Sequence, residues 1–245
     1  MKLIQLNMWG GRLNSQIINF LDSENPDIVC LQEAVDFDGD IALFLGTIQA
    51  IQANVNQPYT EVFFSPAFRF KFMNKSAGFG NCILSRYPAI EKQISFTHLG
   101  LEEDFSFDKH SYNARNFQHA RLDTGQAKIN VLNHHGYHIA GHKKGDANTI
   151  RQMKQLGEYI DNLSGPVMVT GDFNLAPDSK SLGQINTRLT NLSLKHGLKT
   201  TRTNLTPKTE VCDYIFVNDK VKVKSFGVSE KLISDHKALI LEFDI

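Results

Sequence analysis

Asp172 and Asn174 closely follow an apolar run, Val-Met-Val-Thr, at residues 167–170. Such a run is typical of a strand buried on both faces. A carboxylate and a carboxamide are costly to bury without partners, so their place at the end of a buried strand asks for an explanation. A turn explains this segment alone, because Gly, Asp, Asn and Pro all favour turns. A shared site becomes the better interpretation if other strands end in the same way.

Other strand-like runs also begin or end with side chains that can bind metals or move protons. They are Asn7, Glu33, Asn81, Asp213, the pair His134 and His135, and the pair Asp235 and His236. Each of these alone also fits a cap, a turn or an ordinary surface pair. Where strands of a packed sheet end together, however, their terminal residues converge in one cleft. We therefore expect one site assembled from residues across the whole chain.

The chemistry of this set follows from its residue types, which are carboxylates, carboxamides and histidines. Hard oxygen ligands favour Mg²⁺ or Mn²⁺ over zinc. A histidine titrates near neutral pH, and a carboxylate behind it fixes its tautomer. The combination is typical of phosphoester hydrolysis, in which a cation takes up developing negative charge and a side chain orients the attacking water.

Alternating and continuous apolar patterns predict the elements that must position these residues. Strands rich in Val, Ile, Leu and Phe are predicted at 2–7, 27–33, 61–65, 80–85, 128–135, 166–172, 213–217, 222–228 and 238–245. Helical periodicity predicts helices over 14–24, 40–53, 147–163 (with Asp146 as its N-cap) and, more weakly, 179–196. The segment 100–120 shows no periodicity and is expected to be a long surface loop. Because strands outnumber helices, we expect two packed sheets with helices outside.

Length and charge limit the function classes. A chain of 245 residues with 41% hydrophobic and 21% charged residues is expected to fold into a globular structure with a sizeable core. Lys plus Arg and Asp plus Glu both total 26, so the formal net charge is zero. This balance argues against a large basic face for nucleic acid, although a local basic rim around a cleft stays compatible with it.

The cysteines and the N-terminus indicate a compartment. Cys30, Cys82 and Cys212 each lie in or beside an apolar run, which predicts buried, reduced thiols. The N-terminal residues lack the apolar core of a signal peptide, and the apolar runs are too short to span a membrane. We expect a cytoplasmic monomer without a membrane span.

Seven short motifs occur in the order found in one large superfamily. They are LNMW (6–9), CLQEA (30–34), GNCILSRYP (80–88), NHHG (133–136), TGDFN (170–174), DYIF (213–216) and SDH (234–236). In these motifs the chain resembles the endonuclease/exonuclease/phosphatase superfamily, which includes DNase-I-like nucleases, tyrosyl-DNA phosphodiesterases, sphingomyelinases and inositol polyphosphate phosphatases. The stretch 133–152 resembles a bacterial group within it. The resemblance implies one domain, 1–245, folded as a four-layer α/β sandwich of two mainly antiparallel sheets with helices outside.

The resemblance also implies roles for the strand-end residues. Glu33 is similar to the principal ligand of a divalent cation, with Asn7 beside it and Asp235 as a metal-side or water-positioning acid. Asp172 and Asn174 resemble the pair that orients the water and contacts the phosphate.

Two histidines complete the implied machinery. His236 resembles the catalytic histidine, backed by Asp213. His135 resembles a second histidine near the leaving group, and only one of His134 and His135 is expected to enter the cleft, because neighbouring strand residues face opposite ways.

Contacts to the substrate are predicted less specifically. The candidates are Asn81, Arg115, Lys143 and Lys144. The two lysines fit a phosphate-binding rim and a solvated loop equally well. Trp9 directly follows a strand and is predicted to be a core residue rather than a platform for stacking bases.

The expected function is that of a phosphodiesterase or nuclease that uses Mg²⁺ or Mn²⁺ and acts on DNA, RNA or a nucleic-acid adduct. An alternative keeps the chemistry and replaces the substrate with a small phosphorylated metabolite or lipid head group, which the zero net charge favours. A catalytically silent binding module is a third hypothesis. The sequence speaks against it, because no expected catalytic position is replaced.

Overall fold

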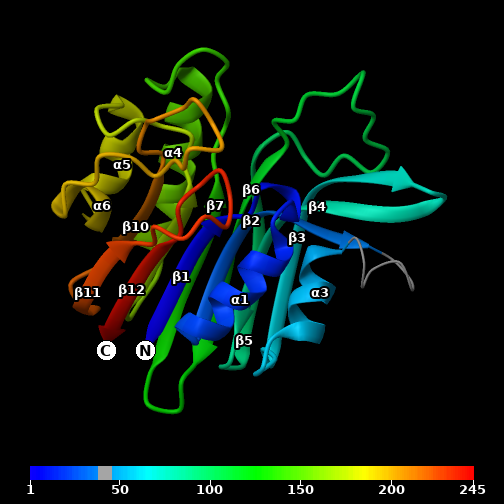
Figure 1. Cartoon of the computed structure of the whole chain (residues 1–245). Coiled ribbons are helices and arrows are strands. Elements are labelled where there is room, and N and C mark those ends of the chain that lie inside the picture. Colours follow the sequence, from blue (N-terminus) through cyan, green and yellow to red (C-terminus); the bar gives the residue numbers. More distant parts are fainter. Residues whose placement is uncertain (38–45) are drawn as a thin grey trace.

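Two six-stranded sheets form the frame of the protein in a computed structural model that describes residues 1–37 and 46–245 (Figure 1). The first sheet has the order β11 (Lys222–Val228), β12 (Leu239–Asp244), β1 (Lys2–Asn7), β2 (Ile28–Phe37), β4 (Lys75–Ser85) and β3 (Glu61–Phe72). The second has the order β5 (Ala89–His98), β6 (Arg115–Asp123), β7 (Lys128–His135), β8 (Val167–Asp172), β10 (Asp213–Val217) and β9 (Thr190–Asn191). Neighbouring strands pair antiparallel, except for the parallel pairs β1–β2 and β7–β8.

Each parallel pair is joined by a crossover helix, as parallel strands require. Helix α1 (Asn14–Glu24) connects β1 to β2, and α4 (Ala147–Asp161) connects β7 to β8. Asp146 caps α4 by accepting a hydrogen bond from the Thr149 backbone N–H at 3.0 Å, which confirms the predicted N-cap. The remaining helices are η1 (Trp9–Gly11), α3 (Thr47–Asn54), η2 (Lys180–Leu182), α5 (Gly183–Asn186) and α6 (Leu192–Lys195).

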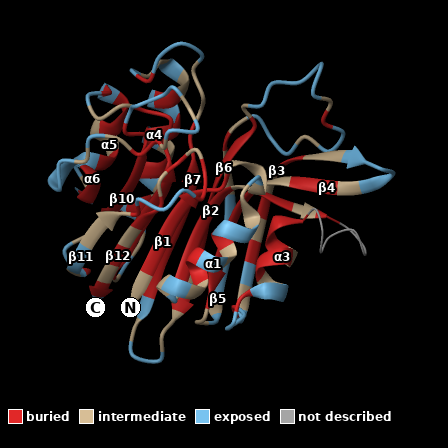
Figure 2. Ribbon diagram, viewed as in Figure 1, coloured by how far each residue is buried: buried red, intermediate tan, exposed pale blue. Residues whose placement is uncertain are grey.

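Alternation along the strands divides the core into layers. Side chains such as Leu3 and Leu241 meet Val131 and Met168 between the two sheets. The next residues along the strands face outward: Ile4 and Leu6 pack with α1 and α3, while Leu132 and Val169 pack with α4 and α5. Figure 2 shows the central strands largely buried and exposed stretches on α1. These layers confirm the predicted four-layer sandwich.

Some predicted elements differ from the structure. Strands β5 and β6 were not predicted, and residues 115–120 lie in β6 instead of a loop. Strand β5 is a largely exposed edge, and β6 buries Asn116, Gln118 and His119, so neither shows an apolar run. The structure breaks 179–196 into η2, α5, β9 and α6 because Thr190 and Asn191 pair with β10. Of the predicted helix 40–53, residues 40–45 lie outside the described residues, and α3 begins at Thr47.

Cys30, Cys82 and Cys212 are free and buried, which confirms the predicted buried thiols. Across residues 1–37 and 46–245, no helix is both long and apolar enough to cross a membrane.

Candidate active site

The register of the strands brings the predicted residues to one edge of the sandwich. In the second sheet His135 of β7 pairs with Asp172 of β8, which in turn pairs with Asp213 of β10. In the first sheet Asn7 of β1 pairs with Gln32 of β2. Residues far apart in the sequence are therefore neighbours at this edge.

Asn7 links the two sheets by hydrogen bonds to one carboxylate from each sheet. Its Nδ2 donates to Glu33 Oε1 at 3.1 Å and to Asp172 Oδ2 at 3.2 Å. Its Oδ1 accepts from the Trp9 backbone N–H at 3.1 Å. One amide thus gathers two carboxylate oxygens around a single point, and it does so with its nitrogen rather than its oxygen.

Glu33 reaches this point from a β-bulge in β2. Leu31 pairs with Cys82 and Ala34 with Gly80, so two residues of β2 oppose one of β4. Glu33 adopts a left-handed backbone with φ 56°, which is uncommon for a residue with a side chain. Burial raises the pKa of Glu33, partly offset by the hydrogen bond from Asn7 and the charge of His236. Among the described residues, no lysine or arginine forms an ion pair with its carboxylate.

Asp172 and Asn174 form a tight turn after β8. The Asn174 backbone N–H donates to Asp172 Oδ1 at 2.9 Å, and Asn174 has φ 54°. Lys143 Nζ donates to Asn174 Oδ1 at 2.5 Å. Gly136 lets the turn approach β7, because a Cβ there would lie 2.1 Å from the Phe173 carbonyl oxygen.

His236 is held by Asp213. Its Nδ1 lies 2.9 Å from Asp213 Oδ2 and 3.0 Å from Oδ1. Gln5 Nε2 donates to Oδ1 at 3.0 Å, and Thr201 Oγ1 donates to Oδ2 at 2.6 Å. Burial opposes the charged imidazolium, but Asp213 and Asp172 outweigh it and raise the pKa of His236. The ring is fixed in one orientation by a fully hydrogen-bonded carboxylate.

A chain of buried amide side chains links the two sheets and holds the Asp213 carboxylate in place. Gln5 Nε2 donates to Gln32 Oε1 at 2.8 Å, Gln32 Nε2 to Asn133 Oδ1 at 2.6 Å, and Asn133 Nδ2 to Gln118 Oε1 at 3.2 Å. All four side chains are buried. Because Gln5 also donates to Asp213, the network holds the acid at a set position relative to both sheets.

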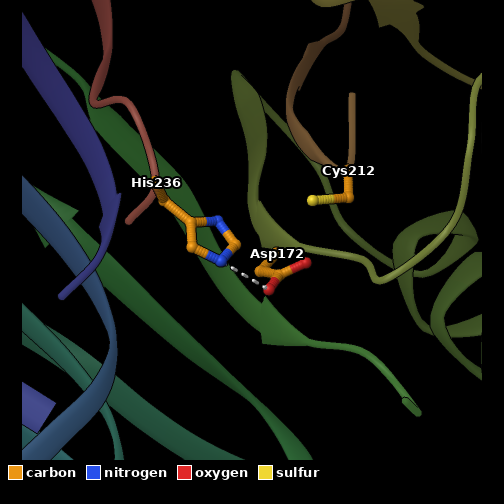
Figure 3. Close-up of side chains that lie close together, drawn as sticks. All are labelled: Asp172, Cys212 and His236. Atoms are coloured by element: carbon orange, nitrogen blue, oxygen red, sulfur yellow. Dashed lines mark ion pairs between the residues drawn. The ribbon is translucent and has the colours of Figure 1, made fainter. Parts of the chain in front are cut away.

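His236 faces Asp172 across the site (Figure 3). Its Nε2 lies 3.6 Å from Asp172 Oδ2. Burial alone would raise the pKa of the Asp172 carboxyl. The nearby positive charges, which include His236, Arg202 and Lys143, outweigh burial and lower that pKa below its usual range. Asp172 is therefore a carboxylate at neutral pH.

Cys212 lies beside this pair, with ligand atoms of Asp172, Cys212 and His236 all within 4.8 Å of one another (Figure 3). Burial, together with Asp172 and Asp213, raises the pKa of the Cys212 thiol well above its usual value. The thiol donates to Asp213 Oδ2 at 3.4 Å. A protonated thiol is a poor metal ligand, so these three residues do not make the preferred metal site.

His135, and not His134, enters the site. His135 Nε2 lies 3.9 Å from Asp172 Oδ2 and 4.0 Å from Glu33 Oε1. His134 points to the opposite face of the sheet, where its ring meets Phe173 edge-on at 5.0 Å between centroids. Within the described part of the chain, both its ring nitrogens lack hydrogen-bond partners.

The buried His134 makes stability depend on pH. Burial lowers the pKa of His134 to about 3, whereas the unfolded chain binds a proton on this histidine near its ordinary value of 6.5. The unfolded state therefore binds more protons between these values, and the free energy of unfolding falls as pH falls. For His134 alone we expect a loss of about 2 kcal/mol between about pH 7.5 and pH 5. Urea unfolding of wild type and His134→Phe at both pH values measures it: the variant should lose about that much less, and equal losses would contradict the assignment.

Of the residues predicted to contact the substrate, some reach the site and others do not. Arg115 is buried, donates from Nε to the Gly136 carbonyl at 2.8 Å, and lines a cavity with Glu33 and His135. Asn81 donates to Asn116 Oδ1 at 3.0 Å, so its amide nitrogen is committed to β6. Lys143 reaches the site through Asn174, whereas Lys144 is exposed and its side chain makes no contact there.

Asp235, predicted as a metal-side or water-positioning acid, lies beside Arg202. Arg202 Nη1 is 3.7 Å from Asp235 Oδ2 and also contacts His236 Nε2. Arg202 is buried, and its Nε has no hydrogen-bond partner among the described residues. Sequence reasoning missed this arginine, because it belongs to no strand end and no motif.

The prediction that Trp9 is a core residue is wrong. Trp9 is partly exposed, has φ 53°, and lines the cavity shared with Glu33 and His135. Its backbone N–H is used by Asn7 Oδ1, and Arg12 stacks on its ring at 4.4 Å. The turn after β1 thus directs the indole toward the site.

A family model described as "Endonuclease/Exonuclease/phosphatase family" matches residues 4–236. The chain belongs to this family. Its members are phosphoesterases that generally depend on a divalent metal. No match was found among the curated proteins.

Solved structures that share this fold belong to proteins with different names. A mannosyl-6-phosphatase from Bacteroides thetaiotaomicron has 16% identity and a TM-score of 0.74, with 100% of both chains covered. TDP2 of D. rerio, complexed with a single-strand DNA product, has 17% identity and a TM-score of 0.70, covering 100% of this chain and 99% of that one. A family protein from Leptotrichia buccalis has 14% identity and a TM-score of 0.72, with full coverage of both chains. At these identities the likeness shows the fold alone.

The residues of this family member fit a divalent cation. Glu33 Oε1 and Asp172 Oδ2 both contact the same Asn7 amide, so two carboxylate oxygens converge. Glu33 has a raised pKa because it is buried, and it forms no ion pair with a described lysine or arginine. A hard cation bound by carboxylates supplies the missing charge.

Proposed function

We propose that this protein is a phosphodiesterase that depends on Mg²⁺ or Mn²⁺ and acts on nucleic acid or a nucleic-acid adduct. The observation that carries the proposal is the position of Asp172. Its carboxylate lies between the Asp213–His236 pair on one side and the Asn7–Glu33 pair on the other. An ionised acid next to both a proton-transfer pair and a metal site is the arrangement that hydrolysis of a phosphoester needs.

Each side chain then has a role. Glu33 and Asp172 would hold the cation, which supplies charge stabilisation for the phosphate when bound. Asp172, ionised at neutral pH, orients the attacking water by accepting a hydrogen bond from it, and its own position is set by the Asn174 backbone. His236, with its pKa raised by Asp213, offers Nε2 to the phosphate or the leaving oxygen. His135 lies next to Glu33, with its Nε2 4.0 Å from Glu33 Oε1.

Three buried cations surround the carboxylates. They are Arg115, Lys143 and Arg202. Together with His236 they offset the charge of the nearby acids, so that an added divalent cation makes the site electropositive. An electropositive site attracts a phosphoester anion.

Arg202 is expected to bind a phosphate oxygen. Its replacement in Arg202→Met should lower kcat/KM about 10- to 100-fold, since a hydrogen bond to a charged group contributes about 1.5–3 kcal/mol. Steady-state kinetics on a phosphodiester measure this, and circular dichroism checks that the variant is folded. The matched control is Arg188→Met, which removes a surface arginine paired with Asp161. Equal kinetics for both variants would exclude Arg202 from substrate binding.

A phosphatase acting on a small phosphorylated metabolite or lipid head group is the second candidate. The zero net charge favours it, because a polynucleotide groove usually carries a basic excess. A mannosyl-6-phosphatase from Bacteroides thetaiotaomicron shares this fold, which supports a phosphorylated sugar among the candidate substrates.

Hydrolysis of a generic aryl phosphodiester beside the matching monoester tests the proposal. Metal-dependent cleavage of the diester, with affinity that falls steeply as salt is added, would support a nucleic-acid substrate. Turnover of the monoester alone would favour the phosphatase. A folded, metal-loaded protein that hydrolyses neither these esters nor a broad panel of oligonucleotides and phosphorylated metabolites would support the silent module.

A further inference from the structure

A cavity of about 300 Å³ opens directly beside the site. Its lining residues are Trp9, Gly10, Arg12, Glu33, Phe79, Tyr112, Arg115 and His135. Glu33 and His135 also belong to the site, so a group in the cavity and a phosphate at the site would be contiguous. We call this cavity the aromatic pocket.

Three aromatic rings form flat walls of the aromatic pocket, and they come from separate parts of the chain. Trp9 follows β1, Phe79 lies in β4, and Tyr112 lies in the loop before β6. Phe79 stacks on Phe68 at 5.0 Å between centroids, and Tyr112 meets Phe105 edge-on at 5.3 Å. The walls are therefore supported by neighbouring rings.

Trp9 is coupled to the acids of the site. Its backbone N–H is bound by the same Asn7 amide that contacts Glu33 and Asp172. Trp9 and the next residue, Gly10, both have left-handed backbone, at φ 53° and 63°. A bulky side chain rarely adopts this conformation, and here it turns the indole toward the pocket.

The lining selects for a planar ring and against a sugar. Aromatic faces stack on planar bases, and the Arg12 guanidinium already lies over the Trp9 ring in this way. A sugar with many hydroxyls needs several acidic or amide partners. Among the described lining residues, Glu33 alone has a carboxylate and none has an amide side chain.

We propose that the aromatic pocket binds the base of a nucleotide-type phosphoester whose phosphate lies at the site. This inference rests on the proposed function and names its substrate class. It predicts that the base adjoining the scissile phosphate contributes to recognition by stacking, with little dependence on which base it is.

Binding tests the pocket without catalysis. Trp9 is the single tryptophan of the chain, so its fluorescence reports on the pocket. A deoxynucleoside 5′-monophosphate should quench it and bind at least about tenfold more tightly than deoxyribose 5-phosphate, which differs only in lacking the base. Calorimetry of the same two ligands provides an independent affinity. Equal affinities would overturn the inference.

Turnover of two matched oligonucleotides provides a second test of the pocket. One carries a base and the other an abasic analogue beside the cleaved phosphate, so their charge is the same. We expect kcat/KM to be at least about tenfold higher with the base, and Tyr112→Ala to reduce this ratio toward one. The control is Leu101→Ala, which removes an exposed apolar side chain of the same loop that does not line the pocket.

The outcomes separate the two proposals. Cleavage of both oligonucleotides with equal kcat/KM overturns the pocket and leaves the phosphodiesterase intact. Base-selective binding without any metal-dependent turnover supports the pocket and contradicts the proposed function. Equal binding without turnover overturns both.

Discussion

Asp172→Asn is expected to lower kcat for phosphoester hydrolysis about 100- to 1,000-fold, the range by which loss of one group that stabilises the transition state electrostatically lowers kcat. The physical reason is the lost negative charge. Asp172 Oδ2 lies 3.6 Å from His236 Nε2 and 3.2 Å from Asn7 Nδ2, so the neutral amide neither orients the water nor binds a cation with the same strength. Steady-state kinetics at saturating metal would measure the loss.

The control for this substitution is Asp178→Asn, an exposed aspartate a few residues along the same loop. It should leave kcat unchanged. Because asparagine has nearly the same shape as aspartate, Asp172→Asn should fold, and its circular dichroism should match that of the wild type. Retention of full activity by Asp172→Asn would remove this residue from the catalytic machinery.

Glu33→Gln is expected to weaken binding of Mg²⁺ or Mn²⁺ by about 100-fold or more. Loss of a residue behind the metal ligands typically costs 10- to 100-fold in affinity, and loss of a ligand charge should cost at least as much. Titration calorimetry on metal-stripped protein measures this directly. Without metal the variant should be at least as stable as the wild type, because the burial that raises the pKa of Glu33 outweighs the nearby positive charge of His236.

Glu103→Gln is the matched control for metal binding, since Glu103 is a surface acid paired with Arg69. It should bind metal like the wild type. An unchanged affinity in Glu33→Gln would place the metal elsewhere, for example at the group of Asp172, Cys212 and His236.

The residues at strand ends were predictable because burial and polarity conflict there. Asn7, Asp172 and Asp213 follow or begin apolar strands, and the register of those strands places them together. A polar residue in such a position must find a partner or a ligand. The chain order of the motifs indicated both the fold and these residues before any contact was known.

The features that the sequence did not predict show no such conflict between burial and polarity. Strand β6 is polar because its buried amides face the site and the other sheet. Its sequence therefore lacks the apolar run that identifies a buried strand. Arg202 lies in a loop and reaches His236 through a contact that only the fold creates. The left-handed backbones at Trp9 and Glu33 fall on residues that do not favour them, and local propensity cannot predict where their side chains point.

The central claim is that Asp172, the Asp213–His236 pair and the Asn7–Glu33 pair form one metal-dependent phosphoesterase site. The most direct measurement is hydrolysis of a phosphodiester and its monoester by metal-stripped protein, before and after addition of Mg²⁺ or Mn²⁺, with Asp172→Asn alongside. We expect no turnover without metal, restored turnover of the diester with metal, and little in the variant. Equal turnover with and without metal, or equal turnover by the variant, would contradict the claim.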